Sequence, residues 1–165
     1  MAIIMNTPNG YAEIVKQFGD IRKYILSNGT LSSQFEMKYM GNAVLPYPLK
    51  LAWMPEKTIK RMYCHRDMIP VFQKVFNDIY QAGLAPKAEL FGGCFNFRLK
   101  RTTNKLSTHS WGIAIDLNPA TNALGTKGNM NPSIVKIFKN NGFIWGGDWA
   151  DLNCDPMHFQ FCDGY

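Results

Sequence analysis

The sequence predicts one α+β domain with a small, mostly antiparallel sheet and helices packed on one face. Segments of strand character outnumber long helical segments, and the two kinds do not alternate regularly. The chain has 165 residues, a length typical of one domain. No repeat, low-complexity tract or linker divides it, so we expect a single domain over residues 1–165, with no separate domain for surface binding.

Residues 1–55 show little regular pattern, and we expect them to wrap around the core. Two short parts of this segment are exceptions. Residues 11–18 are predicted to form a short helix that Gly19 ends. Residues 45–49 must be extended, because each of their two prolines restricts the residue before it.

Two longer helices are expected further along the chain. The first spans residues 66–82, where apolar side chains recur at helical spacing and Gly83 follows. The second spans residues 132–140, with Asn131 as its N-cap and Pro132 in its first turn. The strands are expected at residues 59–64, 88–98, 112–118, 143–145 and 157–161.

The charge of the chain limits its partners. The net charge is +6 and the isoelectric point is about 9.2, which favours nucleic acid, anionic lipid or an anionic bacterial wall. The densest basic cluster is too short and mixed for a nucleic-acid motif, and a solvated loop at a strand end is the favoured interpretation. This cluster comprises Arg98, Lys100, Arg101 and Lys105. We therefore expect no nucleic-acid partner.

Membrane insertion and export are also not expected. No segment approaches the run of about 18 apolar residues that a membrane span needs. The first ten residues lack the basic start of a signal peptide, so synthesis in a cytoplasm is expected. The four cysteines form no C-x-x-C pair, so a structural zinc knuckle is not expected. Because no export signal is expected, we predict that the four thiols are reduced.

Two segments near the C-terminal end carry the chemistry. In residues 112–117 the bulky side chains share one face of a predicted strand, and Asp116 shares the other face with small neighbours. In residues 157–161 His158 and Gln160 lie opposite an apolar face in the same way. Each strand therefore presents a metal-binding side chain on the face away from the core, and His109 precedes the first strand.

These residue types suit a catalytic zinc ion. Zinc binds imidazole nitrogen and carboxylate oxygen, and a catalytic site keeps one position open for water. His109, Asp116 and His158 would supply three ligands, and Asp155 would handle protons beside them. Taken alone, each histidine is more often a hydrogen-bonded structural residue, and each aspartate a cap. The combination on two matching strands favours the metal site.

The patterns Ser107-x-His109-x6-Asp116 and Asp155-x-x-His158 resemble one zinc peptidase family. It includes D-alanyl-D-alanine carboxypeptidases, vancomycin-resistance dipeptidases and phage L-alanyl-D-glutamate endolysins. The resemblance implies a carboxypeptidase or hedgehog-like fold, zinc as cofactor, and Asp155 as general base. Residues 8–11 and 142–149 also resemble the phage branch. The aspartate at position 155 favours endopeptidase action, because other members often have glutamate there.

The resemblance also suggests residues on the substrate side. Arg98 and Ser107 are candidates for substrate binding, although Arg98 could equally be a surface charge. Trp111 is a candidate for the substrate groove, as are Trp145 and Trp149, with core packing as the alternative. Asp148 either orients a ligand histidine or caps a turn.

The sequence thus predicts a zinc-dependent peptidase acting on the stem peptide of bacterial peptidoglycan. We expect a monomeric phage or prophage lysis enzyme that waits in the host cytoplasm and acts on the cell wall. A D-alanyl-D-alanine carboxypeptidase and a non-catalytic, zinc-stabilised wall-binding module are the alternatives. His65, the third histidine, lacks ligand-like spacing and is expected to be structural.

Overall fold

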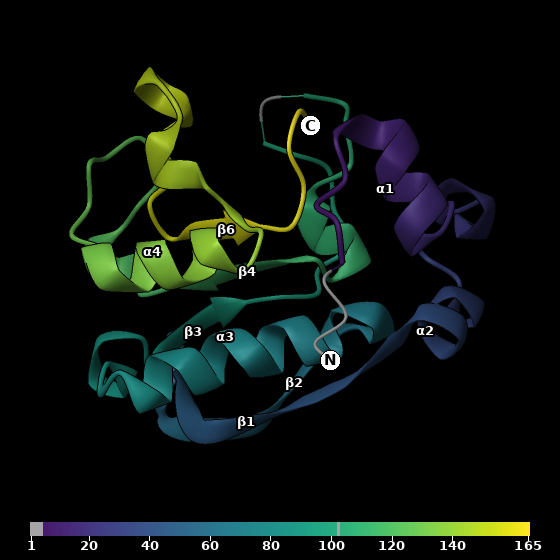
Figure 1. Cartoon of the computed structure of the whole chain (residues 1–165). Coiled ribbons are helices and arrows are strands. Elements are labelled where there is room, and N and C mark those ends of the chain that lie inside the picture. The colour runs from purple at the N-terminus through teal and green to yellow at the C-terminus, as the bar shows by residue number, and fades with distance from the viewer. Residues whose placement is uncertain (1–4, 102) are drawn as a thin grey trace.

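A six-stranded sheet organises the protein, and its order β2-β1-β3-β4-β6-β5 confirms the predicted fold class (Figure 1). The computed structural model describes residues 5–101 and 103–165. Only β1 and β3 pair in parallel; the other neighbours are antiparallel. The strands are β1 (Met40–Leu51), β2 (Met54–His65), β3 (Leu90–Gly93), β4 (Ala114–Leu117), β5 (Ile144–Trp145) and β6 (His158–Gln160).

Two helices cover one face of this sheet. Figure 1 shows α3 (Ile69–Gln81) and α4 (Pro132–Asn140) side by side, with α4 over the β4–β6 half. The ring of Phe138 in α4 stacks on Phe159 in β6, with centroids 4.0 Å apart. The apolar sides of β4 and β6 are therefore buried against α4. Neither these helices nor the others described are long and apolar enough to cross a membrane.

Both of the longer helices predicted from the sequence are present. The bounds of α4 agree with the prediction, because the Asn131 side chain accepts hydrogen bonds from the amides of Ser133 and Ile134. The predicted helix at 66–82 is a 3-10 turn over Arg66–Met68 followed by α3. Four predicted strands are shorter than expected: β3, β4, β5 and β6.

The prediction that residues 1–55 are irregular is wrong for the described part. The predicted helix at 11–18 is present as α1 (Gly10–Phe18), and the predicted extended residues 45–49 lie within β1. The segment also contains α2 (Ser33–Tyr39), and β1 pairs with β2 as a long hairpin, neither of which was predicted. The two prolines of β1 argued against a paired strand, because a proline has no backbone N–H to donate to a neighbouring strand. The hairpin tolerates them where its register shifts, between Val44 and Leu49.

Candidate metal centre

Two neighbouring strands bring Asp116 and His158 together. β4 and β6 are antiparallel, and Asp116 lies directly opposite His158 in their register. Ile115 and Phe159 form the adjacent pair and are fully buried on the helix side. Alternation therefore places Asp116 and His158 on the opposite face of the sheet, as the sequence predicted.

His109 reaches the same point from a short turn, η4 (Thr108–Trp111). Ser107 caps this turn, because its hydroxyl accepts a hydrogen bond from the amide of His109 at 3.3 Å. Gly112 follows with a φ of +67°, and a Cβ there would lie 2.7 Å from the amide nitrogen of His65. Only glycine fits this tight junction between the turn and β4.

The three candidate ligand atoms form a nearly equilateral triangle. His158 Nδ1 lies 3.0 Å from Asp116 Oδ1, His109 Nε2 lies 3.3 Å from the same oxygen, and the two nitrogens are 3.2 Å apart. A tetrahedral zinc ion at normal bond lengths keeps its ligand atoms about 3.3 Å apart. The triangle therefore has the size that a zinc ion requires.

Hydrogen bonds to the other ring nitrogens set the tautomers of both histidines. His109 Nδ1 lies 2.7 Å from the carbonyl oxygen of Cys94, and His158 Nε2 lies 2.9 Å from Oε1 of Gln160. Each of these nitrogens faces an acceptor and so carries a proton. The lone pairs of His109 Nε2 and His158 Nδ1 consequently point at each other and at a carboxylate oxygen, an arrangement that a cation stabilises.

Electrostatics in the metal-free protein agree with this geometry. Burial opposes ionisation of Asp116, but the two histidines outweigh it and hold the pKa of the carboxyl well below its usual range. Burial also lowers the pKa of His158, yet the hydrogen bond and charge of Asp116 raise it overall. Asp116 is therefore a carboxylate beside both histidine nitrogens, and a divalent cation would compete with protons for the same three atoms.

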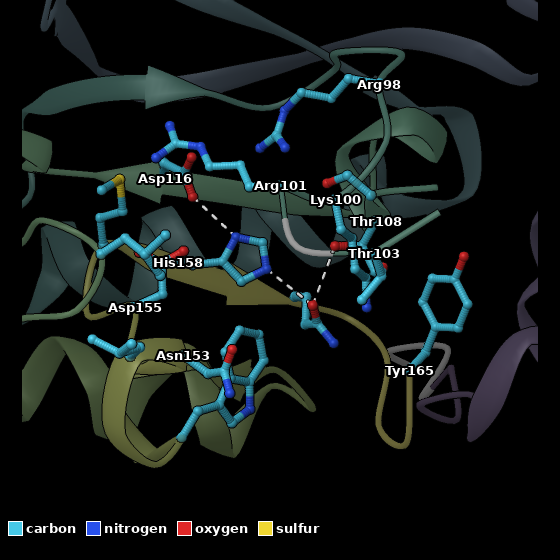
Figure 2. A pocket seen from close by; sticks show the side chains of 16 residues that line it. Arg98, Lys100, Arg101, Thr103, Thr108, Asp116, Asn153, Asp155, His158 and Tyr165 are labelled. Carbon is cyan, nitrogen blue, oxygen red and sulfur yellow. Dashed lines mark hydrogen bonds and ion pairs between the residues drawn. The ribbon is translucent and has the colours of Figure 1, made fainter. Parts of the chain in front are cut away.

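A pocket of about 340 Å³ opens beside the triangle, and Asp155 lines it with Asp116 and His158 (Figure 2). Two backbone hydrogen bonds hold Asp155 in place: its amide donates to the carbonyl oxygen of Gly146, and its carbonyl oxygen accepts from the amide of His158. Its Oδ1 atom is buried without a hydrogen-bond partner in the described part of the chain. Burial raises the pKa of this carboxyl, although the nearby His158 opposes the rise.

The segment that carries this site matches a known family. Residues 100–161 match the family model described as D-alanyl-D-alanine carboxypeptidase. This match confirms the resemblance to that peptidase family. The matched segment includes the three candidate ligands and Asp155. No solved structure matches the chain.

Two further residues suggested by this carboxypeptidase resemblance lie at the pocket. Arg98 and Ser107 both line it, together with Lys100 and Arg101. Figure 2 shows the side chains of Arg98 and Arg101 on the Asp116 side of His158, across the pocket from Asn153. The basic cluster is therefore more than a solvated loop at a strand end, because three of its four members line the pocket.

Two predicted roles need correction. Trp111 is fully buried, its indole nitrogen donates to the carbonyl of Gly19 at 3.0 Å, and it does not line the pocket. It packs in the core because η4 turns it away from the ligands. Asp148 contacts neither ligand histidine; its half-exposed carboxylate pairs with Lys139 of α4. The carbonyl of Cys94 and the amide of Gln160 orient the histidines instead.

Sequence reasoning missed other contributors to the site. Strand alternation placed Gln160 on the same face as His158, but no role was predicted for its side chain, which accepts the hydrogen bond from the His158 ring. Trp149, a predicted candidate for the substrate groove, lines the pocket, and its ring centroid lies 5.5 Å from that of His158. The contribution of Cys94 comes from its backbone carbonyl, for which the side-chain pattern holds no signal.

Proposed function

We propose that this protein is a zinc-dependent peptidase that cleaves the L-alanyl-D-glutamate bond of the peptidoglycan stem peptide. The observation that carries the proposal is the triangle of ligand atoms beside the buried Asp155, in a pocket with a basic rim. The matching family supports a peptidase acting on peptidoglycan peptides. We infer that His109, Asp116 and His158 hold the zinc ion.

Asp155 would act as the general base. A zinc ion held by the triangle would polarise the peptide carbonyl and make a water molecule more acidic. The unpartnered Oδ1 of Asp155 is free to accept the proton of the attacking water and return it to the leaving amine. Burial raises the pKa of Asp155, which makes its carboxylate a better base than an exposed aspartate.

Arg98 would recognise substrate at the rim of the pocket. In a stem peptide D-glutamate is linked through its side chain, so its α-carboxylate stays free beside the bond to be cleaved. A guanidinium group suits such a carboxylate, and Arg98 lines the pocket with Ser107. Ser107 would act chiefly through η4, because its hydroxyl caps the turn that holds His109.

A D-alanyl-D-alanine carboxypeptidase is the second candidate. The matched family carries this description, and a terminal carboxylate could also pair with Arg98. The aspartate at position 155 and the resemblance of residues 8–11 and 142–149 to the phage branch support the endopeptidase. We extend the proposal to a monomeric phage lysis enzyme that stays in the host cytoplasm until it reaches the wall.

Digestion of purified peptidoglycan, with and without a chelator, tests the proposal. Mass spectrometry of the products should show stem peptides cut after the first L-alanine, and the chelator should abolish their release. Loss of one terminal D-alanine would instead identify the carboxypeptidase. Zinc binding without any cleavage would contradict both and favour a wall-binding module.

A further inference from the structure

A second concave surface, here called the side groove, adjoins the pocket. It has a volume of about 510 Å³, and Arg98 lines both the groove and the pocket. The side groove and the pocket therefore meet at Arg98. The apolar lining residues of the side groove are Ile25, Leu31, Phe95, Phe97, Leu99 and Leu106.

Three separate segments build the walls of the side groove. A bridge between Ile25 and Leu31 closes one loop, and a bridge between Leu99 and Leu106 closes another. The backbone amide of Arg98 donates to the hydroxyl of Ser110 at 3.1 Å, which fixes the junction with the pocket. Leu99 is 51% exposed, so its apolar surface remains open to a ligand.

The side groove carries one charged residue of each sign among its described lining residues. Among its described lining residues, Glu36 is the one acidic residue and Arg98 the one basic residue. The Oε1 atom of Glu36 accepts a hydrogen bond from the hydroxyl of Tyr63 at 3.0 Å, which orients the carboxylate. Its Oε2 atom has no hydrogen-bond partner within residues 5–101 and 103–165.

We propose that the side groove binds an aliphatic side chain that ends in an ammonium group. This inference rests on the proposed function: the side chain belongs to the stem-peptide residue after D-glutamate, which is a diamino acid. Arg98 would hold the D-glutamate carboxylate, the apolar walls would contact the methylene groups, and Glu36 would pair with the ammonium.

Other ligands fit the side groove less well. An anionic side chain would meet the carboxylate of Glu36, and like charges repel. A wholly apolar side chain would cover that carboxylate without replacing the water it loses, which costs free energy. A side chain with an apolar stem and a positive end satisfies both parts of the lining.

Two synthetic stem peptides test this inference on the zinc-loaded full chain. They differ only at the residue after D-glutamate, which is lysine in one and norleucine in the other. We expect kcat/KM to favour lysine by roughly two- to fivefold, the range for a partly exposed charge pair. Glu36→Gln should bring this ratio close to one, and E36K should invert it.

Matched variants separate binding from structure. Tyr63→Phe removes the hydrogen bond that orients Glu36 but keeps the carboxylate, so its lysine preference should lie between those of the wild type and Glu36→Gln. Glu56→Gln removes an exposed carboxylate outside the groove and should retain the wild-type lysine preference. Thermal unfolding of each variant identifies any that fail to fold, and the wild-type comparison of the two peptides stands without them.

The relative cleavage of the two peptides can refute the inference in two ways. Equal cleavage of both peptides by the wild-type protein, or a lysine preference that survives in Glu36→Gln, would overturn the inference. Cleavage of neither peptide would overturn the proposed function instead. In that event, calorimetric titration of both peptides into the wild-type protein still tests the groove, and equal affinity would refute it.

Discussion

Gln160 accepts a hydrogen bond from Nε2 of His158, two residues before it on β6, with the atoms 2.9 Å apart. The side-chain nitrogen Nε2 of Gln160 donates a hydrogen bond to the carbonyl oxygen of Cys162. The hydroxyl of Thr108 donates to Oε1 of Gln160, the atom that accepts from His158. Gln160 therefore fixes both the rotation and the tautomer of the His158 ring, and with them the direction of the lone pair on Nδ1.

Replacing Gln160 should weaken metal binding without unfolding the protein. Gln160→Leu leaves Nε2 of His158 without its acceptor, and we expect zinc affinity to fall by about 10- to 100-fold. Competition with a chromophoric chelator measures the affinity. Gln160→Glu keeps an acceptor at this position and serves as the control. Unchanged affinity in Gln160→Leu would show that Gln160 does not orient the ring.

Zinc should stabilise the folded protein, because the triangle of ligand atoms exists only in the folded state. At zinc concentrations 100-fold above Kd, the free energy of unfolding should rise by about 2.7 kcal/mol. Thermal unfolding with zinc or with a chelator measures this difference. It should vanish in His109→Ala and persist in His65→Gln, whose ring lies outside the triangle. A zinc response that survives in His109→Ala would refute this ligand set.

Asp155→Asn should separate catalysis from metal binding. It removes the proposed base but none of the ligand atoms, so peptidoglycan hydrolysis should fall by roughly 10²- to 10⁴-fold. Zinc affinity should stay within a few-fold of the wild-type value. Asp151→Asn changes an exposed carboxylate on the same loop and should retain activity. Full activity in Asp155→Asn would exclude Asp155 as the base.

The third histidine should make stability depend on pH. His65 is buried, its Nδ1 accepts the amide of Asp67, and its Nε2 donates to the carbonyl of Phe18 at 3.1 Å, so the ring is neutral. Burial lowers its pKa from the ordinary value of 6.5, although Asp67 opposes this shift. Below pH 6.5 the unfolded chain binds a proton that the folded protein does not, so stability falls with falling pH.

Urea unfolding between pH 5 and 8, with a chelator in every sample, measures this dependence. His65→Gln should be less stable than the wild type at pH 8 by about 1–3 kcal/mol, because buried hydrogen bonds are lost. The difference between the two proteins should shrink as the pH falls below 6.5. A constant difference over this range would show that His65 does not titrate differently in the two states.

Trp111→Phe should affect stability rather than substrate binding. The substitution removes the hydrogen bond to Gly19 and part of the contact with Tyr11 and Tyr165, which should cost about 1–3 kcal/mol of unfolding free energy. KM should not change, because the ring lies outside the pocket. Trp149→Phe, in the pocket wall, is the comparison and should raise KM. A raised KM in Trp111→Phe alone would restore the original prediction.

Local patterns were enough for much of this architecture. The cap at Asn131 placed α4 correctly, and strand alternation placed Asp116 and His158 on one face. Only residues 45–49 of β1 were predicted as extended, because Pro46 and Pro48 are unusual in a paired strand. The pairing of β1 with β2 depends on a register shift that the sequence of one strand does not indicate. The position of Trp111 depends on Gly19, which is 92 residues away in the sequence, and that of Asp148 on Lys139 in the preceding helix.

The opposition of Asp116 and His158 across β4 and β6 also links the metal to local opening of the fold. These residues are 42 positions apart, so only pairing of the two strands brings their ligand atoms together. Fraying of the short β6 would separate them, and an ion at the triangle would resist that fraying. Amide protons of β6 would then exchange with solvent at a rate set by metal occupancy. Slow exchange there would report an intact site, and fast exchange the onset of metal loss.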